Sequence, residues 1–113
     1  MKYFNLNEFD CKCGCGRNNM QTSTLEKLDE ARELAGVPFK INSGCRCSTH
    51  NVNSGSTSRN HLSGRAADIN ATDSFTRGVI LRSLILVGFK RIGLHRSFIH
   101  ADDMDILEAT WFY

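Results

Sequence analysis

Long apolar runs are missing from this sequence, and their absence excludes proteins that cross a membrane as helices. No stretch approaches the roughly 20 apolar residues that such a helix needs. The apolar core of a signal peptide is also missing from residues 1–8, which include polar and acidic side chains. We therefore expect synthesis in the cytoplasm without a signal peptide, and we expect no membrane among the partners.

A large excess of either charge is missing as well. The sequence has 14 Lys and Arg against 12 Asp and Glu, which gives a net charge of +2 and a pI near 8.3. Proteins that bind nucleic acid through a basic surface usually carry a much stronger positive charge. This balance argues against nucleic acid as a partner.

Internal repeats and linker-like segments are not found in the 113 residues of the chain. A chain of this length can bury roughly two thirds of its unfolded surface around one core. We therefore expect a single domain over residues 1–113, and we expect it to act as a monomer.

The first half of the sequence predicts a helix followed by a strand. Ser23 and Glu26 have the spacing of a capping box, in which each side chain satisfies a free amide at the start of a helix. Apolar residues follow at helical spacing, and Gly36 with Pro38 ends the pattern after about twelve residues. Residues 39–42 alternate apolar and polar side chains, as a half-buried strand does.

The middle of the sequence predicts a loop, a strand and a second helix. Residues 51–60 are rich in Asn, Ser, Gly and Thr, which is typical of a mobile surface loop. Residues 66–70 are predicted to form a short strand, and Asp73 or Ser74 to cap a helix that Gly88 ends. We expect this helix to be more buried than the first, through the apolar residues Phe75, Val79, Leu81, Ile85 and Leu86.

Two further strands are predicted at residues 89–94 and 97–101, with a turn near His95 and Arg96. Helices followed by adjacent strands are typical of α+β folds. We therefore expect an α+β fold in which helices pack on an antiparallel sheet.

His61, Asp68 and His100 form the candidate metal site. A catalytic zinc typically keeps three protein ligands and leaves its fourth position to water or substrate. Gly64 and two alanines lie between the first two ligands, where small residues let the backbone fold close around an ion. Two histidines and a carboxylate also suit ferrous iron, but nothing else indicates oxygen chemistry, so zinc is favoured. A chance grouping of histidines and carboxylates would give the same spacing.

The motif His61-x-x-Gly64-x-Ala66-x-Asp68, followed by His100 in a strand-like context, resembles the zinc signature of the D-alanyl-D-alanine carboxypeptidase and endopeptidase family. That family includes zinc DD-carboxypeptidases, vancomycin-resistance D,D-dipeptidases and phage L-alanyl-D-glutamate endolysins. It shares its fold with the hedgehog signalling domain. The resemblance implies a hedgehog-like α+β fold and a bound zinc ion.

The resemblance extends beyond the ligands. Residues 41–46 resemble the family's strand that ends in a Ser-Gly-x-Arg turn, and residues 4–16 resemble the start of short phage and prophage members. In all, the main match covers about residues 40–70 and 88–102.

The resemblance also implies which residues move protons. In many relatives an acidic residue three positions before the last His ligand is the general base, and Ser97 occupies that position here. His95 matches a histidine that stabilises the transition state in some relatives, and an imidazole can also shuttle a proton. Alternatively, His95 is only a solvent-exposed turn residue. Asp102 would either orient His100, which we prefer, or supply the missing carboxylate.

Two residues are predicted to contact the substrate. Arg46 resembles the family's arginine that binds substrate and stabilises the developing oxyanion, because a guanidinium can grip a carboxylate or carbonyl at two points. A solvated surface arginine is the alternative. Relatives usually have a serine two residues before the first His ligand; here Arg59 holds that position and Ser58 precedes it.

The five cysteines lie in two clusters, Cys11-Lys-Cys13-Gly-Cys15 and Cys45-Arg-Cys47. Their spacing differs from the paired Cys-x-x-Cys motifs of zinc ribbons. Three states remain open: a second, structural zinc held by four thiolates, one or two disulfides formed in an oxidising space, and free thiols packed as small apolar groups. The odd number leaves at least one cysteine over in any disulfide scheme.

Three functions follow from these patterns. The first is a zinc metallopeptidase that hydrolyses peptidoglycan stem peptides at the bacterial cell wall, as a D-Ala-D-Ala carboxypeptidase or an L-Ala-D-Glu endolysin. A holin or a virion component would supply its export. The second is a non-catalytic, zinc-containing module that binds cell walls or builds a virion, which Ser97 favours. The third is a metal nuclease of the His-Asn-His type, prompted by His50-Asn51 and Asn60-His61 and disfavoured by the low charge. We predict the first.

Overall fold

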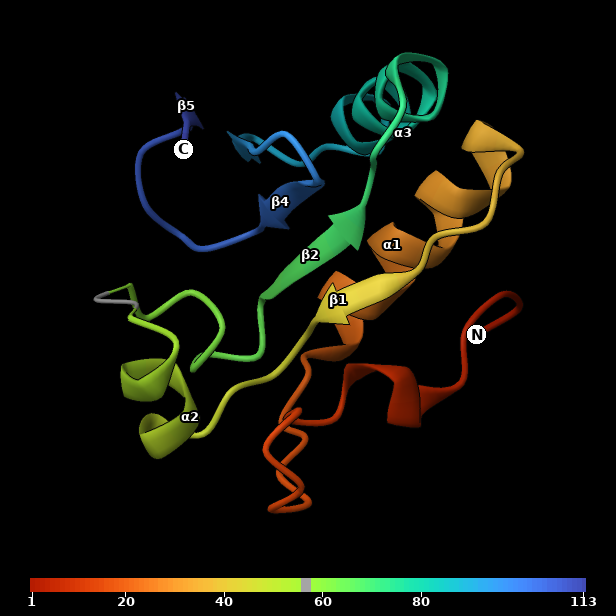
Figure 1. Ribbon diagram of the computed structural model, residues 1–113. Helices are drawn as coiled ribbons and strands as arrows, with labels where there is room; N and C mark the ends of the chain where they lie inside the picture. Colours follow the sequence, from red (N-terminus) through yellow and green to blue (C-terminus); the bar gives the residue numbers. More distant parts are fainter. Residues whose placement is uncertain (56–57) are drawn as a thin grey trace.

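The computed structural model describes residues 1–55 and 58–113, and the central element of this part of the chain is a five-stranded sheet (Figure 1). Neighbouring strands follow the order β1-β2-β4-β3-β5. In chain order their bounds are Ile41–Ser43, Ala66–Asn70, Arg91–Leu94, Phe98–Asp102 and Ala109–Phe112 for β1 to β5. The expected α+β class is confirmed.

The sheet is mixed rather than antiparallel throughout. β1, β2, β4 and β3 pair antiparallel, as expected, but β5 pairs parallel to β3. The chain reverses after β4 and passes the start of β3 to reach the far edge, so β5 runs in the direction of β3. The expectation of an antiparallel sheet was therefore wrong at this edge, because it did not include β5.

One face of the sheet is covered by two helices. α1 (Thr22–Ala35) and α3 (Ser74–Leu86) pack against each other, and α3 also contacts β4. The core lies between these helices and the sheet, and its fully buried side chains include Leu28, Ala31, Ile69, Ile80, Leu84 and Ile99. The short helices η1 (Leu6–Phe9) and α2 (Ser48–Asn53) lie elsewhere, α2 well apart from α1 and α3 (Figure 1).

The start of α1 differs from the prediction. Ser23 lies inside the helix, and Gln21 is its N-cap with no side-chain capping bond. A contact distant in sequence holds this end, because the backbone N–H of Gln21 donates to the carbonyl of Gly64 at 2.8 Å. The helix ends as predicted at Gly36, whose φ of 69° is the left-handed conformation that glycine adopts without strain.

The N-cap of α3 was predicted correctly, but the burial of the helix was not. Asp73 is the N-cap, and its side chain accepts a hydrogen bond from the backbone N–H of Thr76 at 2.8 Å. Phe75, Ile85 and Leu86, however, are exposed. The helix buries Ile80, Ser83 and Leu84. It is therefore no more buried than α1, because only one of its faces meets α1 and the sheet.

α2 occupies the start of the predicted loop at residues 51–60. Its residue Asn51 is buried, and Cys47 caps the helix with its sulfur. Residues 56 and 57 of the predicted mobile loop lie outside the described residues. The strands predicted at 66–70, 89–94 and 97–101 correspond to β2, β3 and β4 within one or two residues at each end. Among the described residues, none of the helices combines the length and the apolarity that crossing a membrane requires.

Replacing a buried leucine of α1 should cost more stability than replacing an exposed leucine of the same helix. We expect Leu28→Ala in α1 to lower the free energy of unfolding by about 2–5 kcal/mol, because it leaves a cavity against the sheet. Leu34→Ala is the matched control, since its side chain is 56% exposed, and we expect a change within about 0.5 kcal/mol. Denaturant unfolding measures both, and equal losses would contradict the assigned core.

Candidate active site

One row of residues crosses the sheet on the face away from α1 and α3. Backbone pairing sets Asp68 opposite His100, His100 opposite Gly93, and Gly93 opposite Trp111. Side chains alternate between the two faces of a strand. Because Ile69 and Ile99 face the core, the adjacent residues Asp68 and His100 face the other side.

His61 reaches the same place from the turn that precedes β2. Its Nδ1–H donates to the carbonyl of Gly44 at 2.7 Å. The turn ends at Gly64, which has a φ of 73° and lies against Asn19, where a Cβ would be 2.1 Å from the backbone oxygen. Only glycine fits this position, so the glycine of the motif holds the turn that carries His61.

The three candidate ligands converge as a metal site requires. Asp68 Oδ1 lies 3.3 Å from His61 Nε2 and 2.9 Å from His100 Nδ1, and the three ligand atoms lie within 4.8 Å of one another. Zinc bonds of about 2.0–2.1 Å in a tetrahedron would place ligand atoms about 3.3 Å apart. All three side chains are buried. The structure thus brings together the residues predicted from the motif.

Hydrogen bonds behind the two imidazoles decide which nitrogens face the site. His61 uses Nδ1–H on Gly44, and His100 uses Nε2–H on Asp102 Oδ2 at 2.7 Å. The lone pairs of His61 Nε2 and His100 Nδ1 therefore point toward Asp68. Two lone pairs and a carboxylate in one buried place repel each other unless a cation lies between them. The donor set therefore fits zinc.

Asp102 orients His100 and does not line the pocket described below. Its carboxylate is fully buried and also accepts a 2.8 Å hydrogen bond from Arg91 Nε. Burial alone would raise the pKa of Asp102, but the hydrogen bond from His100 outweighs it and lowers the pKa. This placement favours the orienting role over proton transfer from the substrate.

Arg46 lies beside the candidate metal ligands. Its Nη2 is 3.3 Å from Asp68 Oδ2, its Nε donates to Ser43 Oγ at 3.0 Å, and its Nη1 is 3.4 Å from Asn51 Oδ1. Burial would raise the pKa of Asp68, but in the metal-free protein hydrogen bonds from the protonated forms of His100 and His61 hold it well below its usual range. The guanidinium is thus fixed next to a permanent negative charge.

The candidate ligands open into a pocket of about 570 Å³. Arg46 and Ser58, the two predicted substrate contacts, both line this pocket. Ser58 also accepts a hydrogen bond from the backbone N–H of Asn60 at 3.1 Å. Three aromatic side chains form part of the wall, Phe98, Trp111 and Tyr113.

His95 and Ser97 lie beside the wall and not among the residues that line the pocket. The His95 ring stacks on Phe98 with centroids 4.4 Å apart and meets Tyr113 edge-on at 5.6 Å. Its Nδ1 accepts a hydrogen bond from the backbone N–H of Ser97 at 3.1 Å. His95 therefore supports the aromatic wall, and the described contacts do not connect it to the ligands.

Trp111 and Tyr113 are pocket residues that sequence reasoning missed. Trp111 fits against the sheet because residue 93 is glycine, where a Cβ would be 2.6 Å from the indole Nε1. Partial burial and the negative charge of Asp68 raise the pKa of Tyr113, so its phenol stays protonated at neutral pH. The run of three aromatic residues at positions 111–113 is the signal that could have predicted this strand, because aromatic residues are enriched in strands.

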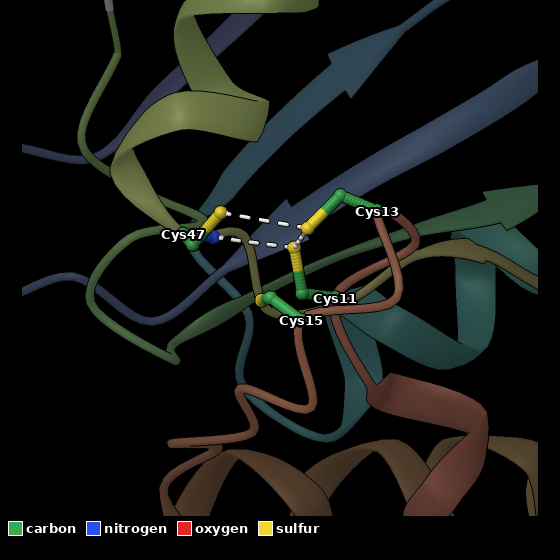
Figure 2. Close-up of side chains that lie close together, drawn as sticks. All are labelled: Cys11, Cys13, Cys15 and Cys47. Carbon is green, nitrogen blue, oxygen red and sulfur yellow. Dashed lines mark hydrogen bonds between the residues drawn. The ribbon is translucent and has the colours of Figure 1, made fainter.

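Four of the five cysteines form a second group that could hold a metal. The sulfur atoms of Cys11, Cys13, Cys15 and Cys47 lie within 4.8 Å of one another (Figure 2). Cys45 is buried apart from them and donates its thiol proton to Asn19 Oδ1 at 2.7 Å. All five cysteines are free thiols in this structure.

Comparison with known protein families assigns most of the chain to a family. The family described as Peptidase M15 matches residues 2–102. The matched region contains the three candidate ligands, Arg46 and the cysteines, and it ends before Trp111 and Tyr113. No curated protein matches the chain significantly.

Asp102→Asn should test the hydrogen bond that orients His100. The amide keeps the shape of the side chain but weakens the acceptor, so we expect zinc affinity to fall about 10- to 100-fold. Asp103→Asn is the matched control, because Asp103 bonds Thr24 and lies near Lys27 and not near the ligands. Competition with a chelator measures both affinities, and an equal loss in the two variants would contradict the orienting role.

Zinc affinity should also depend on pH. Burial would lower the pKa of His100, but hydrogen bonds with Asp102 and Asp68 raise it above 6.5. A proton on His100 Nδ1 occupies the lone pair that zinc needs, so affinity should fall below this raised pKa by about tenfold per pH unit for each proton displaced. Zinc titrations between pH 5 and 9 measure the effect, and a pH-independent affinity would contradict it.

Proposed function

This chain belongs to the peptidase M15 family, and we propose that it is a zinc-dependent peptidase that hydrolyses peptidoglycan stem peptides. The observation that carries the proposal is the convergence of His61, Asp68 and His100 beside Arg46 in one pocket. The bond cut would be that of a D-Ala-D-Ala carboxypeptidase or of an L-Ala-D-Glu endopeptidase, as in endolysins.

The roles of the residues follow from their positions. Zinc, when bound by His61, Asp68 and His100, supplies Lewis-acid chemistry that lowers the pKa of water and polarises a carbonyl group. Arg46 binds the carboxylate or the reacting carbonyl oxygen of the peptide, since it lines the pocket and its ion pair with Asp68 keeps it in place. Asp102 keeps His100 in the required tautomer.

The pocket suits a short anionic peptide. Arg46 and Arg91 are the guanidinium groups of its lining, and the aromatic wall offers apolar surface for alanine methyl groups. A volume of about 570 Å³ lies within the range of small-ligand sites. These features support a substrate of a few residues rather than a folded protein.

Stabilisation of the reacting oxygen would not use a carboxylate outside the ligand set. Among the described residues that line the pocket, Asp68 is the sole acidic one, and it belongs to the ligand set. The protonated phenol of Tyr113 would donate a hydrogen bond to the developing oxyanion. His95, whose ring packs on Tyr113 and does not line the pocket, would keep the phenol in position.

The alternative is a non-catalytic zinc module of the cell wall or of a virion. The observation that favours it is that Ser97, at the position of the usual acid, does not line the pocket and Asp102 is buried behind His100. As an enzyme, the protein would act at the bacterial cell wall as a monomer, with a holin or a virion component supplying export.

An assay on purified peptidoglycan distinguishes the peptidase function from the non-catalytic binding function. We expect the zinc-loaded protein to release D-alanine or to generate new amino groups in the sacculi, and mass spectrometry of the products identifies the bond. His61→Ala should lose this activity because it lacks a ligand. Binding to sacculi without any cleaved bond would favour the alternative.

Tyr113→Phe should lower kcat by about 10²-fold with little change in KM, as removal of an oxyanion donor does. Tyr3→Phe is the matched control, because Tyr3 lies near the N-terminus, packs against Arg32 and does not line the pocket. Steady-state kinetics on a stem-peptide analogue measures both variants. If Tyr113→Phe kept the full kcat, the phenol would have no part in catalysis.

A further inference from the structure

The sulfur atoms of the cysteine group have the spacing of a tetrahedral metal site. Cys11 Sγ lies 3.4 Å from Cys13 Sγ, and Cys13 Sγ lies 3.6 Å from Cys47 Sγ. Zinc bound to four thiolates at about 2.3 Å has sulfur atoms about 3.8 Å apart. We propose that Cys11, Cys13, Cys15 and Cys47 bind a second, structural zinc ion.

The other two states of these cysteines fit less well. A disulfide requires sulfur atoms about 2.05 Å apart, and these cysteines are free thiols. Thiols that pack as small apolar groups should be buried, whereas Cys13 and Cys15 are exposed. Exposed thiols that turn toward one another are explained by a shared ligand and not by packing.

The backbone around the group is arranged to hold thiolate charge. The N–H of Cys47 points at Cys11 Sγ at 3.3 Å, and the N–H of His50 points at Cys47 Sγ at 3.4 Å (Figure 2 shows the first). Such bonds stabilise metal-bound sulfur. Gly14 and Gly16 both have a φ of 84°, which lets the chain turn tightly enough to present three cysteines from one short segment.

The proposal accounts for the odd number of cysteines. Cys45 is close in sequence to Cys47, but its thiol is buried and donates a hydrogen bond to Asn19 instead of joining the group. It belongs to the packing of the turn and leaves four ligands, which is the number that structural zinc takes.

The second zinc would fasten the N-terminal segment to the turn that carries Arg46. Cys47 follows Arg46 directly, and the N–H of Cys45 donates to the carbonyl of Phe9 at 2.9 Å. Gly44 packs on Phe9 so closely that a Cβ would lie 2.8 Å from its Cα. The turn that holds Arg46 and the Gly44 carbonyl is thus attached to the N-terminal segment on both sides.

Metal analysis of the whole purified chain tests the proposal independently of peptidase activity. We expect two zinc ions per chain in the wild type and one in Cys13→Ser. Cys45→Ser should keep two, as the matched cysteine control, and His61→Ala should keep the one held by the thiolates. Cys13→Ser retaining two ions, or a wild type with one ion that His61→Ala loses, would overturn the proposal. So would iron in place of zinc, or an intact mass lowered by disulfide formation.

Cobalt substitution gives a test in the unmutated chain, should Cys13→Ser fail to fold. Cobalt bound by thiolates has intense sulfur-to-metal charge-transfer absorption, which a His/Asp/His site lacks. We expect this absorption in wild type, Cys45→Ser and His61→Ala. Its absence from cobalt-loaded wild type would overturn the proposal and would leave the peptidase assignment unaffected.

Discussion

The antiparallel pairing of β2 with β4 is the constraint on which the site depends. It sets Asp68 opposite His100 and, one pair further along, Ala67 opposite Ala101 on the core face. A slip of one residue would turn one of the two strands over, so that its ligand would enter the core and its apolar residues the pocket. The burial of Ile69 and Ile99 beneath α1 and α3 therefore fixes the position of the candidate metal ligands, since the same register serves both faces.

A chain of hydrogen bonds extends this constraint outward from the ligands. Arg91 bonds Asp102, Asp102 bonds His100, and His100 faces Asp68, each at 2.7–2.9 Å. Every member is buried or nearly so, so each link is strong and leaves little freedom for rotation. The cost of burying these charges is offset only when all partners are present. This makes the site a rigid unit formed by β2, β3 and β4.

Local patterns predicted much of this arrangement. The ligand motif, the strand at residues 66–70, the Asp73 cap and the two strands around residue 95 all appear in the structure. These features depend on short-range spacing, which a sequence displays directly. The start of α1 and the buried side of α3 depend on distant contacts, such as Gln21 with Gly64, and no local pattern contains them.

The aromatic wall was missed for the same kind of reason. Trp111 lies in the edge strand β5 and Tyr113 directly follows it. The chain reaches the neighbouring strand, β3, only by crossing a strand end, so this pairing is not visible in the sequence. The end of helix α2, residues 51–53, was taken for part of a loop because its cap is a cysteine sulfur and its buried residue is Asn51, neither of which is typical of a helix in a sequence.

The candidate metal ligands and the aromatic wall of the pocket come from different parts of the chain, which meet at Gly93. The candidate metal ligands come from β2, β4 and the turn before β2, while two of the three wall residues come from β5 and the position after it, with the Trp111 side chain packed over Gly93. The ligands lie inside the region shared with the family and the two C-terminal aromatic residues lie outside it. Changes in the last strand can therefore alter which peptide is accepted while the metal-binding chemistry stays intact, so related chains with the same ligands need not share a substrate.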